Sequence, residues 1–194
     1  MIGTRTGIAT DRYLPAYDVR SHHAVEVDAT AADTYRAARD LDLGRSIPVL
    51  VLFAIRGLPR ILTGKTRPAR SLTLDSLLDL GFVMLDDAPG AIVMGAVGKF
   101  WRPDSGMIRV GADDFGAFDE PGYAKGIVAF TVEDLDGGGS AVATETRVHC
   151  TSPDARRKFL LYWRAIGPFS GVIRKLMLQE VKRAAEGSPG APSR

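Results

Sequence analysis

The stretch Ala141-Val-Ala-Thr-Glu-Thr-Arg-Val-His-Cys150, which leads through Thr151-Ser-Pro-Asp154 into residues 155–186, decides the fold of this chain. Its first part alternates in the manner of a β-strand, and residues 155–186 form the longest helical pattern in the sequence. A chain that builds an antiparallel sheet and ends in one long amphipathic helix usually lays that helix across the sheet. We therefore expect an α+β protein with a ligand cavity between a curved antiparallel sheet and its last helix.

Length and composition favour a single domain. The chain has 194 residues, 45% of them hydrophobic, which is enough for one sizeable core. The formal net charge of +2 gives no global field of the kind that nucleic-acid binding requires, so no nucleic-acid partner is expected. Cys150 is the single cysteine, which excludes an internal disulfide and fits a reducing compartment. No signal peptide or bilayer-spanning run is evident, and a cytoplasmic location is expected.

Charge is distributed unevenly along the chain. Residues 43–74 contain six basic residues and no acid, residues 75–145 contain thirteen acids against four bases, and the C-terminal helical segment is basic again. The expected helices are therefore basic and the expected sheet acidic. Two interpretations stay open, namely complementarity within the molecule and contact of a basic surface with an anionic membrane or ligand.

The first half of the chain is expected to begin with an extended arm over residues 1–20. A strand follows at residues 22–28, with Val25 and Val27 on one face, and Thr30 caps the next helix with an acid three residues on. Residues 47–62 read as two short helical pieces that meet at a bend, followed by a basic loop at 63–70. A further helix is predicted at residues 72–80.

Strands dominate the second half. Residues 82–85 and 91–100 are predicted to pair as a hairpin around a turn at 86–90, with Gly95 and Gly98 marking a bulge or sharp curvature. Residues 107–118 are ambiguous, and a short strand with a loop is the interpretation offered for them. The strands 123–133 and 141–150 flank a glycine-rich hairpin turn. In the last helix, Gly167-Pro168 predicts a kink, and residues 187–194 form a polar tail.

One broad apolar face is expected on the C-terminal helix. Its members recur at helical spacing and are Phe159, Tyr162, Trp163, Ile166, Phe169, Ile173 and Leu176.

The order of these elements, with the runs Thr144-Glu-Thr-Arg-Val148, Ala155-Arg-Arg-Lys-Phe159 and Tyr162-Trp-Arg-Ala-Ile166, resembles the START-like (SRPBCC) superfamily, in particular its bacterial polyketide cyclase/dehydrase-like group. Ser170-Gly-Val-Ile-Arg174 continues the resemblance, and Lys99-Phe-Trp-Arg-Pro103 agrees with it. It implies the helix-grip fold: a curved antiparallel sheet wrapped around a long kinked C-terminal helix, with two short helices after the first strand. The domain would span residues 21–186. The resemblance implies no catalytic signature.

Apolar and aromatic side chains are expected to line the cavity between sheet and helix. Trp101, Phe130, Trp163 and Ile166 are the natural lining, and Tyr162 adds a polar group. Plain core packing is the alternative for each of them.

Glu145 and Arg147 are the remaining candidate ligand contacts. They lie two residues apart on one strand and hence on one face. If they point inward they form a buried charged pair able to orient a polar ligand group, and if outward they are a surface pair of little energetic worth. The alternation favours the outward orientation, with an inward set of Val142, Thr144, Thr146 and Val148.

Other chemistry is disfavoured. His23 and His149 lie on neighbouring strands but lack the spacing of a metal site, and Cys150 has no suitable base. The segment ending Gly64-Lys-Thr66 has Pro59 where a P-loop requires glycine, so no nucleotide cofactor is expected.

Three functions are therefore compared. The first is binding of a hydrophobic or amphipathic small molecule, such as a lipid, polyketide or terpenoid, by a monomer or homodimer. The second is a cyclase or dehydratase that polarises a carbonyl with Arg147, Glu145 or Tyr162. The third is peripheral lipid exchange at an anionic membrane through Arg56, Arg60 and the basic C-terminal helix. A lipocalin-like barrel is disfavoured because so much of the chain is helical.

Overall fold

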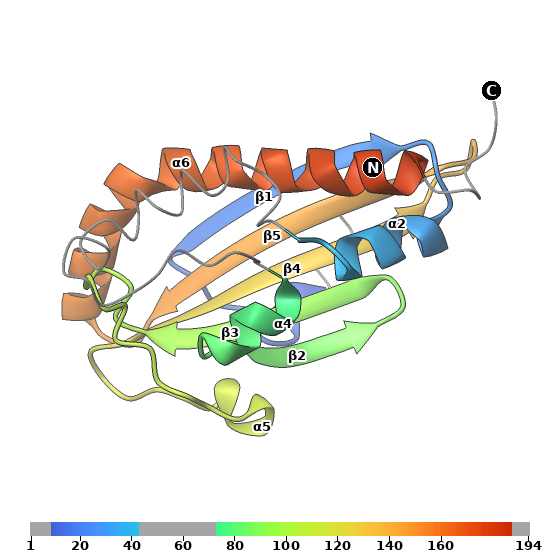
Figure 1. Ribbon diagram of the computed structural model, residues 1–194. Coiled ribbons are helices and arrows are strands. Elements are labelled where there is room, and N and C mark those ends of the chain that lie inside the picture. The colour runs from blue at the N-terminus through green and yellow to red at the C-terminus, as the bar shows by residue number, and fades with distance from the viewer. Residues whose placement is uncertain (1–8, 43–72, 188–194) are drawn as a thin grey trace.

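The computed structural model describes residues 9–42 and 73–187. The helical pieces expected at 47–62 and the basic loop expected at 63–70 lie outside the described residues. Five strands form one antiparallel sheet in the order β1-β5-β4-β3-β2 (Figure 1). They are β1 (Val19–Val27), β2 (Val83–Ala88), β3 (Ala91–Gly98), β4 (Ala124–Asp134) and β5 (Ser140–Cys150).

The helices surround this sheet. They are α2 (Ala31–Arg39), α4 (Leu74–Asp79), α5 (Ala112–Phe115) and α6 (Pro153–Glu186). The predicted cap of α2 is confirmed, since the Thr30 hydroxyl accepts a hydrogen bond from the amide of Asp33. None of the helices in the described ranges combines the length and the apolar character that a membrane span requires.

Helix α6 lies across one face of the sheet, as expected for a helix-grip fold. Its start is set by Ser152, whose hydroxyl accepts a hydrogen bond from the amide of Ala155, and by Pro153 in the first turn. The helix runs on through Pro168, and Figure 1 shows it bent in the half that holds this residue. The α+β helix-grip architecture predicted from the sequence is therefore confirmed.

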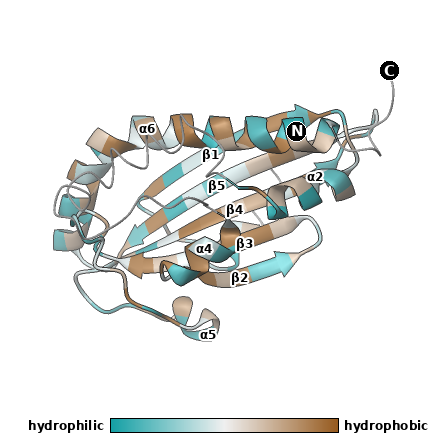
Figure 2. Ribbon diagram, viewed as in Figure 1, coloured by the Kyte–Doolittle hydropathy of each residue, from teal (hydrophilic) through white to brown (hydrophobic). Residues whose placement is uncertain are grey.

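The sheet is covered on both faces. On the helix side, one core cluster joins the sheet to α2, α4 and the second half of α6, for example through Phe130, Val142 and Val181. In Figure 2 the hydrophobic positions of the elements that this cluster joins are brown, for example along β3 and α6. On the other face, Leu14 of the N-terminal segment and Phe115 of α5 pack against strand residues. The arm expected to be extended is thus, over its described part, a cover for the sheet.

Residues 107–118 contain an isolated β-bridge and the short helix α5. Ile108 makes an isolated bridge to Val97, and α5 follows it.

The β2–β3 hairpin differs from the prediction in the extent of its turn and in the position of its bulge. Asp86 belongs to β2 and pairs with Val93, so the turn is confined to Pro89 and Gly90. The register shift lies between Met84 and Asp86 of β2, and not at the glycines of β3. Gly95 instead permits close packing, because a Cβ atom there would lie 2.7 Å from the ring of Phe115 and 2.9 Å from the Leu85 side chain.

Replacing Gly95 with alanine should therefore destabilise the fold. We expect Gly95→Ala to lower the free energy of unfolding by about 1–3 kcal/mol, because the buried Phe115 ring has no space into which to move. Urea unfolding measures this change. Gly137→Ala is the matched control, since a Cβ there meets nothing within 4 Å, and it should shift stability by less than about 0.5 kcal/mol. Equal effects of the two substitutions would contradict the packing argument.

Candidate binding site between the sheet and the C-terminal helix

Polar side chains gather where the middle of α6 crosses the sheet. The buried Arg174 donates from Nε to the Thr146 hydroxyl at 3.1 Å and from a terminal nitrogen to the Ser170 hydroxyl at 2.8 Å. Thr146 belongs to the inward set predicted for β5, so that part of the alternation is confirmed. A guanidinium held by two hydroxyls keeps its full positive charge, and the interface therefore contains a buried cation.

His23 and Thr144 extend this polar cluster along the sheet. They are paired across β1 and β5, and a Cβ on Gly171 of α6 would lie 3.6 Å from Nε2 of His23. Burial, followed by the positive charges of Arg174 and Lys175, lowers the pKa of His23, so its imidazole is neutral at pH 7. The buried Thr144 hydroxyl has no hydrogen-bond partner within the described residues. Such an orphaned polar atom is costly unless something binds to it.

Aromatic side chains lie at the N-terminal end of α6. Phe159 and Trp163 stack with ring centroids 5.8 Å apart, and Tyr162 lies 6.0 Å from Phe159. Trp101 packs against the same cluster. Three of the predicted ligand contacts, Trp101, Tyr162 and Trp163, are thus brought together, and each is half-buried. Their contact with a ligand stays a prediction.

The other predicted apolar contacts are dispersed. Phe130 is buried in the cluster beneath α2 and the second half of α6, and Ile166 is half-buried in the first half. Phe169 does not belong to the inward face as the sequence suggested, since it is 47% exposed. Between Phe159 and Arg174, no residue of α6 is fully buried.

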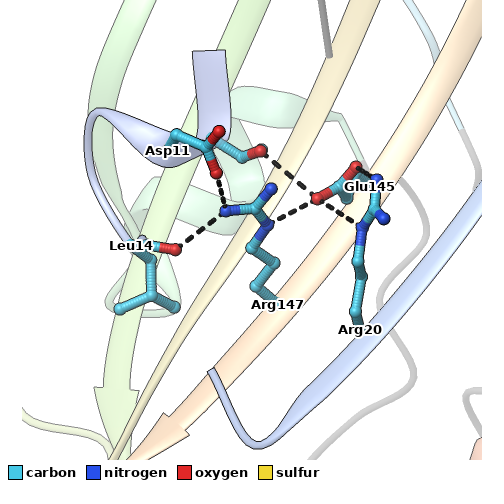
Figure 3. A network of polar contacts seen from close by, with 6 residues as sticks. Asp11, Leu14, Arg20, Glu145 and Arg147 are labelled. Carbon is cyan, nitrogen blue, oxygen red and sulfur yellow. Dashed lines mark hydrogen bonds and ion pairs between the residues drawn. The ribbon is translucent and has the colours of Figure 1, made fainter. Parts of the chain in front are cut away.

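Glu145 and Arg147 do not face the helix. The expectation that they contact a ligand between the sheet and the helix is therefore corrected. They point to the opposite face, as the alternation predicted, but they are not a surface pair. Glu145 is 0% and Arg147 is 3% exposed, because the N-terminal segment covers them. Figure 3 shows the resulting network, in which Arg147 contacts Glu145 and also bonds to Asp11 and to the carbonyl of Leu14.

Glu145 is the common acceptor of this network. Its carboxylate accepts hydrogen bonds from the Thr10 hydroxyl at 3.2 Å and from Arg20 at 3.1 and 2.9 Å, in addition to the contact with Arg147. Burial acts to raise the pKa of Glu145, but the hydrogen bonds from Arg20 and Arg147 outweigh it, and the pKa is lowered. The carboxylate is therefore ionised and fully bonded, which suits it to holding the N-terminal segment.

This geometry does not assemble the catalytic group considered for a cyclase or dehydratase. Tyr162 packs with the aromatic residues on the helix side, whereas Glu145 and Arg147 lie on the other face. One ligand atom cannot be within hydrogen-bond reach of both sets.

The reactive residues at the end of β5 were also considered from the sequence. Nδ1 of His149 lies 3.8 Å from Asp18, and Cys150 is buried. No group of three or more His, Cys, Asp or Glu residues that could hold a metal ion occurs among residues 9–42 and 73–187. An open hollow of about 660 Å³ at this corner is lined by residues 149–153 with Arg156 and Arg157, and it contains none of the predicted ligand contacts.

Sequence reasoning missed Ser170 and Arg174 as site residues. A signal was present, because Arg174 lies four residues after Ser170 and three before Met177, within the buried stripe of α6. A basic residue at such a position indicates a polar site inside the fold. His23 was considered from the sequence for a metal or acid/base role, and not as part of a ligand-binding cluster.

The thiol of Cys150 should be unreactive in the folded protein. Burial and the nearby negative charge of Asp18 raise its pKa to about 12, so the thiolate is almost absent at pH 8. We expect Ellman's reagent to label the native protein at least about a hundredfold more slowly than the urea-unfolded chain. Comparable rates in the two states would contradict the burial of this thiol.

The Glu145 network should make stability depend on pH in a defined direction. Because the folded-state pKa of Glu145 is lowered, its contribution is complete above the unfolded pKa of about 4.3 and is lost as pH falls through the folded-state value. Glu145→Gln should cost about 3 kcal/mol at pH 7, since it removes the buried negative charge that Arg147 and Arg20 share. Urea unfolding from pH 7 to pH 3 should show the difference between wild type and variant shrinking as the pH falls. A difference that is constant over this range would overturn the assignment.

Comparisons with known proteins show no family for this chain. No family model matches it, and no curated protein matches it. Among solved structures, the chain is similar to the one described as the crystal structure of Ara h 8.0201, with 11% sequence identity over 83% of this chain and 98% of that chain. The TM-score of 0.20 is too low for this likeness to support an argument about function. The candidate site therefore depends on its own geometry.

Proposed function

We propose that the protein binds an amphipathic small molecule, of the lipid, polyketide or terpenoid class, between the sheet and the first half and middle of α6. The orphaned hydroxyl of Thr144 is the observation that carries this proposal. A buried hydroxyl without a partner costs free energy in the empty protein, and a polar group of a ligand would recover that cost.

The surrounding polar groups favour a hydrogen-bond acceptor on the ligand. Thr144 pairs with His23 across the strands, and the buried cation Arg174 bonds to Thr146, two residues further along β5. A carbonyl, hydroxyl or carboxylate oxygen is the group that such donors would hold.

The apolar part of the ligand would lie along the first half of α6. Trp163 and Ile166 are half-buried there, and no residue between Phe159 and Arg174 is fully buried. A hydrophobic ligand gains free energy by completing this burial, at about 25 cal/mol per Å² of apolar surface.

Native mass spectrometry before and after organic extraction would identify a co-purifying molecule. The extracted protein would then be titrated with anilinonaphthalenesulfonate, an amphipathic anion whose fluorescence rises in apolar sites. We expect Thr144→Val to weaken binding of this probe about fivefold, which corresponds to one lost hydrogen bond. Trp163→Ala should weaken it about tenfold through lost apolar contact.

Thr131→Val is the matched control, because Thr131 is also buried but its neighbours Ile127 and Ala129 on alternate positions of β4 pack on the other face of the sheet. It should leave probe affinity unchanged. Equal loss of affinity in the Thr144 and Thr131 variants, or no effect of the Thr144 and Trp163 substitutions in folded protein, would exclude this site.

A further inference from the structure

The outer face of α6 presents an apolar stripe to solvent. Five large hydrophobic side chains are exposed among the described residues, and three of them, Leu161, Phe169 and Val172, lie on this helix. Leu161 is 73% exposed, and Phe169 and Val172 are 47% and 49% exposed. Their separations of eight and three residues place them on one side of the helix, together with the exposed Ala165 and Pro168.

The part of α6 that carries this stripe contains only positively charged residues. Residues 155–179 contain no Asp or Glu and six basic residues, of which only Arg174 is buried. The exposed Arg157, Arg164 and Lys175 lie at helical spacing from Leu161 and so flank the stripe on the same side. An apolar stripe bordered only by cations is the pattern of a helix that lies in a membrane interface.

Neighbouring charges leave this pattern intact. Arg156 is bonded to Asp18, and both Arg157 and Lys158 are paired with Asp154 at the start of the helix. These ion pairs lie N-terminal to the stripe, so its middle and its C-terminal flank retain the positive charge of Arg164 and Lys175.

We propose that this outer face of α6, centred on Leu161, Phe169 and Val172, docks on the surface of an anionic lipid bilayer. The stripe extends for about 17 Å along the helix axis, and its large side chains would enter the boundary between headgroups and acyl chains. Arg164 and Lys175 would pair with anionic headgroups, each strengthening binding about fivefold.

A second copy of the chain fits this face less well. In a two-fold dimer the same face would meet itself, and two stripes bordered by cations without an acid would repel each other. Charge complementarity therefore favours a lipid surface. This docking goes beyond the proposed ligand binding and does not depend on it, because it uses side chains that point away from the sheet.

Vesicle flotation of the full chain tests the docking. The vesicles would contain phosphatidylcholine alone, or phosphatidylcholine with about 30% phosphatidylglycerol, at low and high salt. We expect flotation with the anionic vesicles that is at least tenfold stronger than with neutral ones and is weakened by salt. The double variant Leu161→Glu/Phe169→Glu should reduce it at least tenfold.

Matched controls separate this face from general changes in charge. Leu80→Glu introduces an acid at an apolar residue that is 58% exposed outside α6, and it should leave flotation almost unchanged. Arg164→Gln/Lys175→Gln should weaken binding at least tenfold, whereas Arg36→Gln/Arg102→Gln, which removes two exposed charges elsewhere, should not.

The results distinguish docking from its alternatives. Absence of flotation with anionic vesicles, or equal loss in Leu80→Glu and in the double variant, would overturn the proposal. A dimer found by light scattering in wild type and lost in Leu161→Glu/Phe169→Glu would assign the face to a second copy instead. Thr144→Val should bind vesicles as wild type does. Probe titration therefore tests the ligand site, and vesicle flotation tests the docking independently of it.

Discussion

Strand β5 is buried on both of its faces, and this constraint shapes the rest of the molecule. Every residue from Ser140 to Val148 is buried, including an acid, a base and two threonines. One side of the strand is covered by α6 and the other by the N-terminal segment. An unpaired polar group in such a position costs free energy. Because side chains alternate along the strand, Thr144 and Thr146 face α6, whereas Glu145 and Arg147 face the N-terminal segment.

The polar groups on the two faces of β5 differ in how completely they are hydrogen-bonded. On the face of the sheet away from α6, the Glu145 carboxylate accepts hydrogen bonds from Thr10, Arg20 and Arg147, and its charge thereby holds the N-terminal segment in place. On the helix side, the hydroxyl of Thr144 stays without a partner in the described residues. A satisfied network stabilises a structure, whereas an orphaned group beneath a partly packed helix is a natural place for a ligand.

Helix α6 links this inner site to the surface. Its second half is anchored in the core through residues such as Leu178 and Val181, whereas its first half has half-buried residues toward the sheet and exposed apolar residues toward solvent. A segment with few buried contacts has low local stability and can open more easily than the core around it. The proposed ligand site and the proposed bilayer surface would therefore share the half of the helix that is least tightly held.

Local patterns in the sequence determined the architecture. The alternation in β5, the caps at Thr30 and Ser152 and the 34-residue helix are encoded by neighbouring residues, because strand and helix periods repeat over short distances. Only the tertiary structure decided what covers each face. The burial of Glu145 depends on Thr10, which is 135 residues away, and the contact of Arg174 with Thr146 joins two separate elements. Such partners follow from three-dimensional packing, which no local period records.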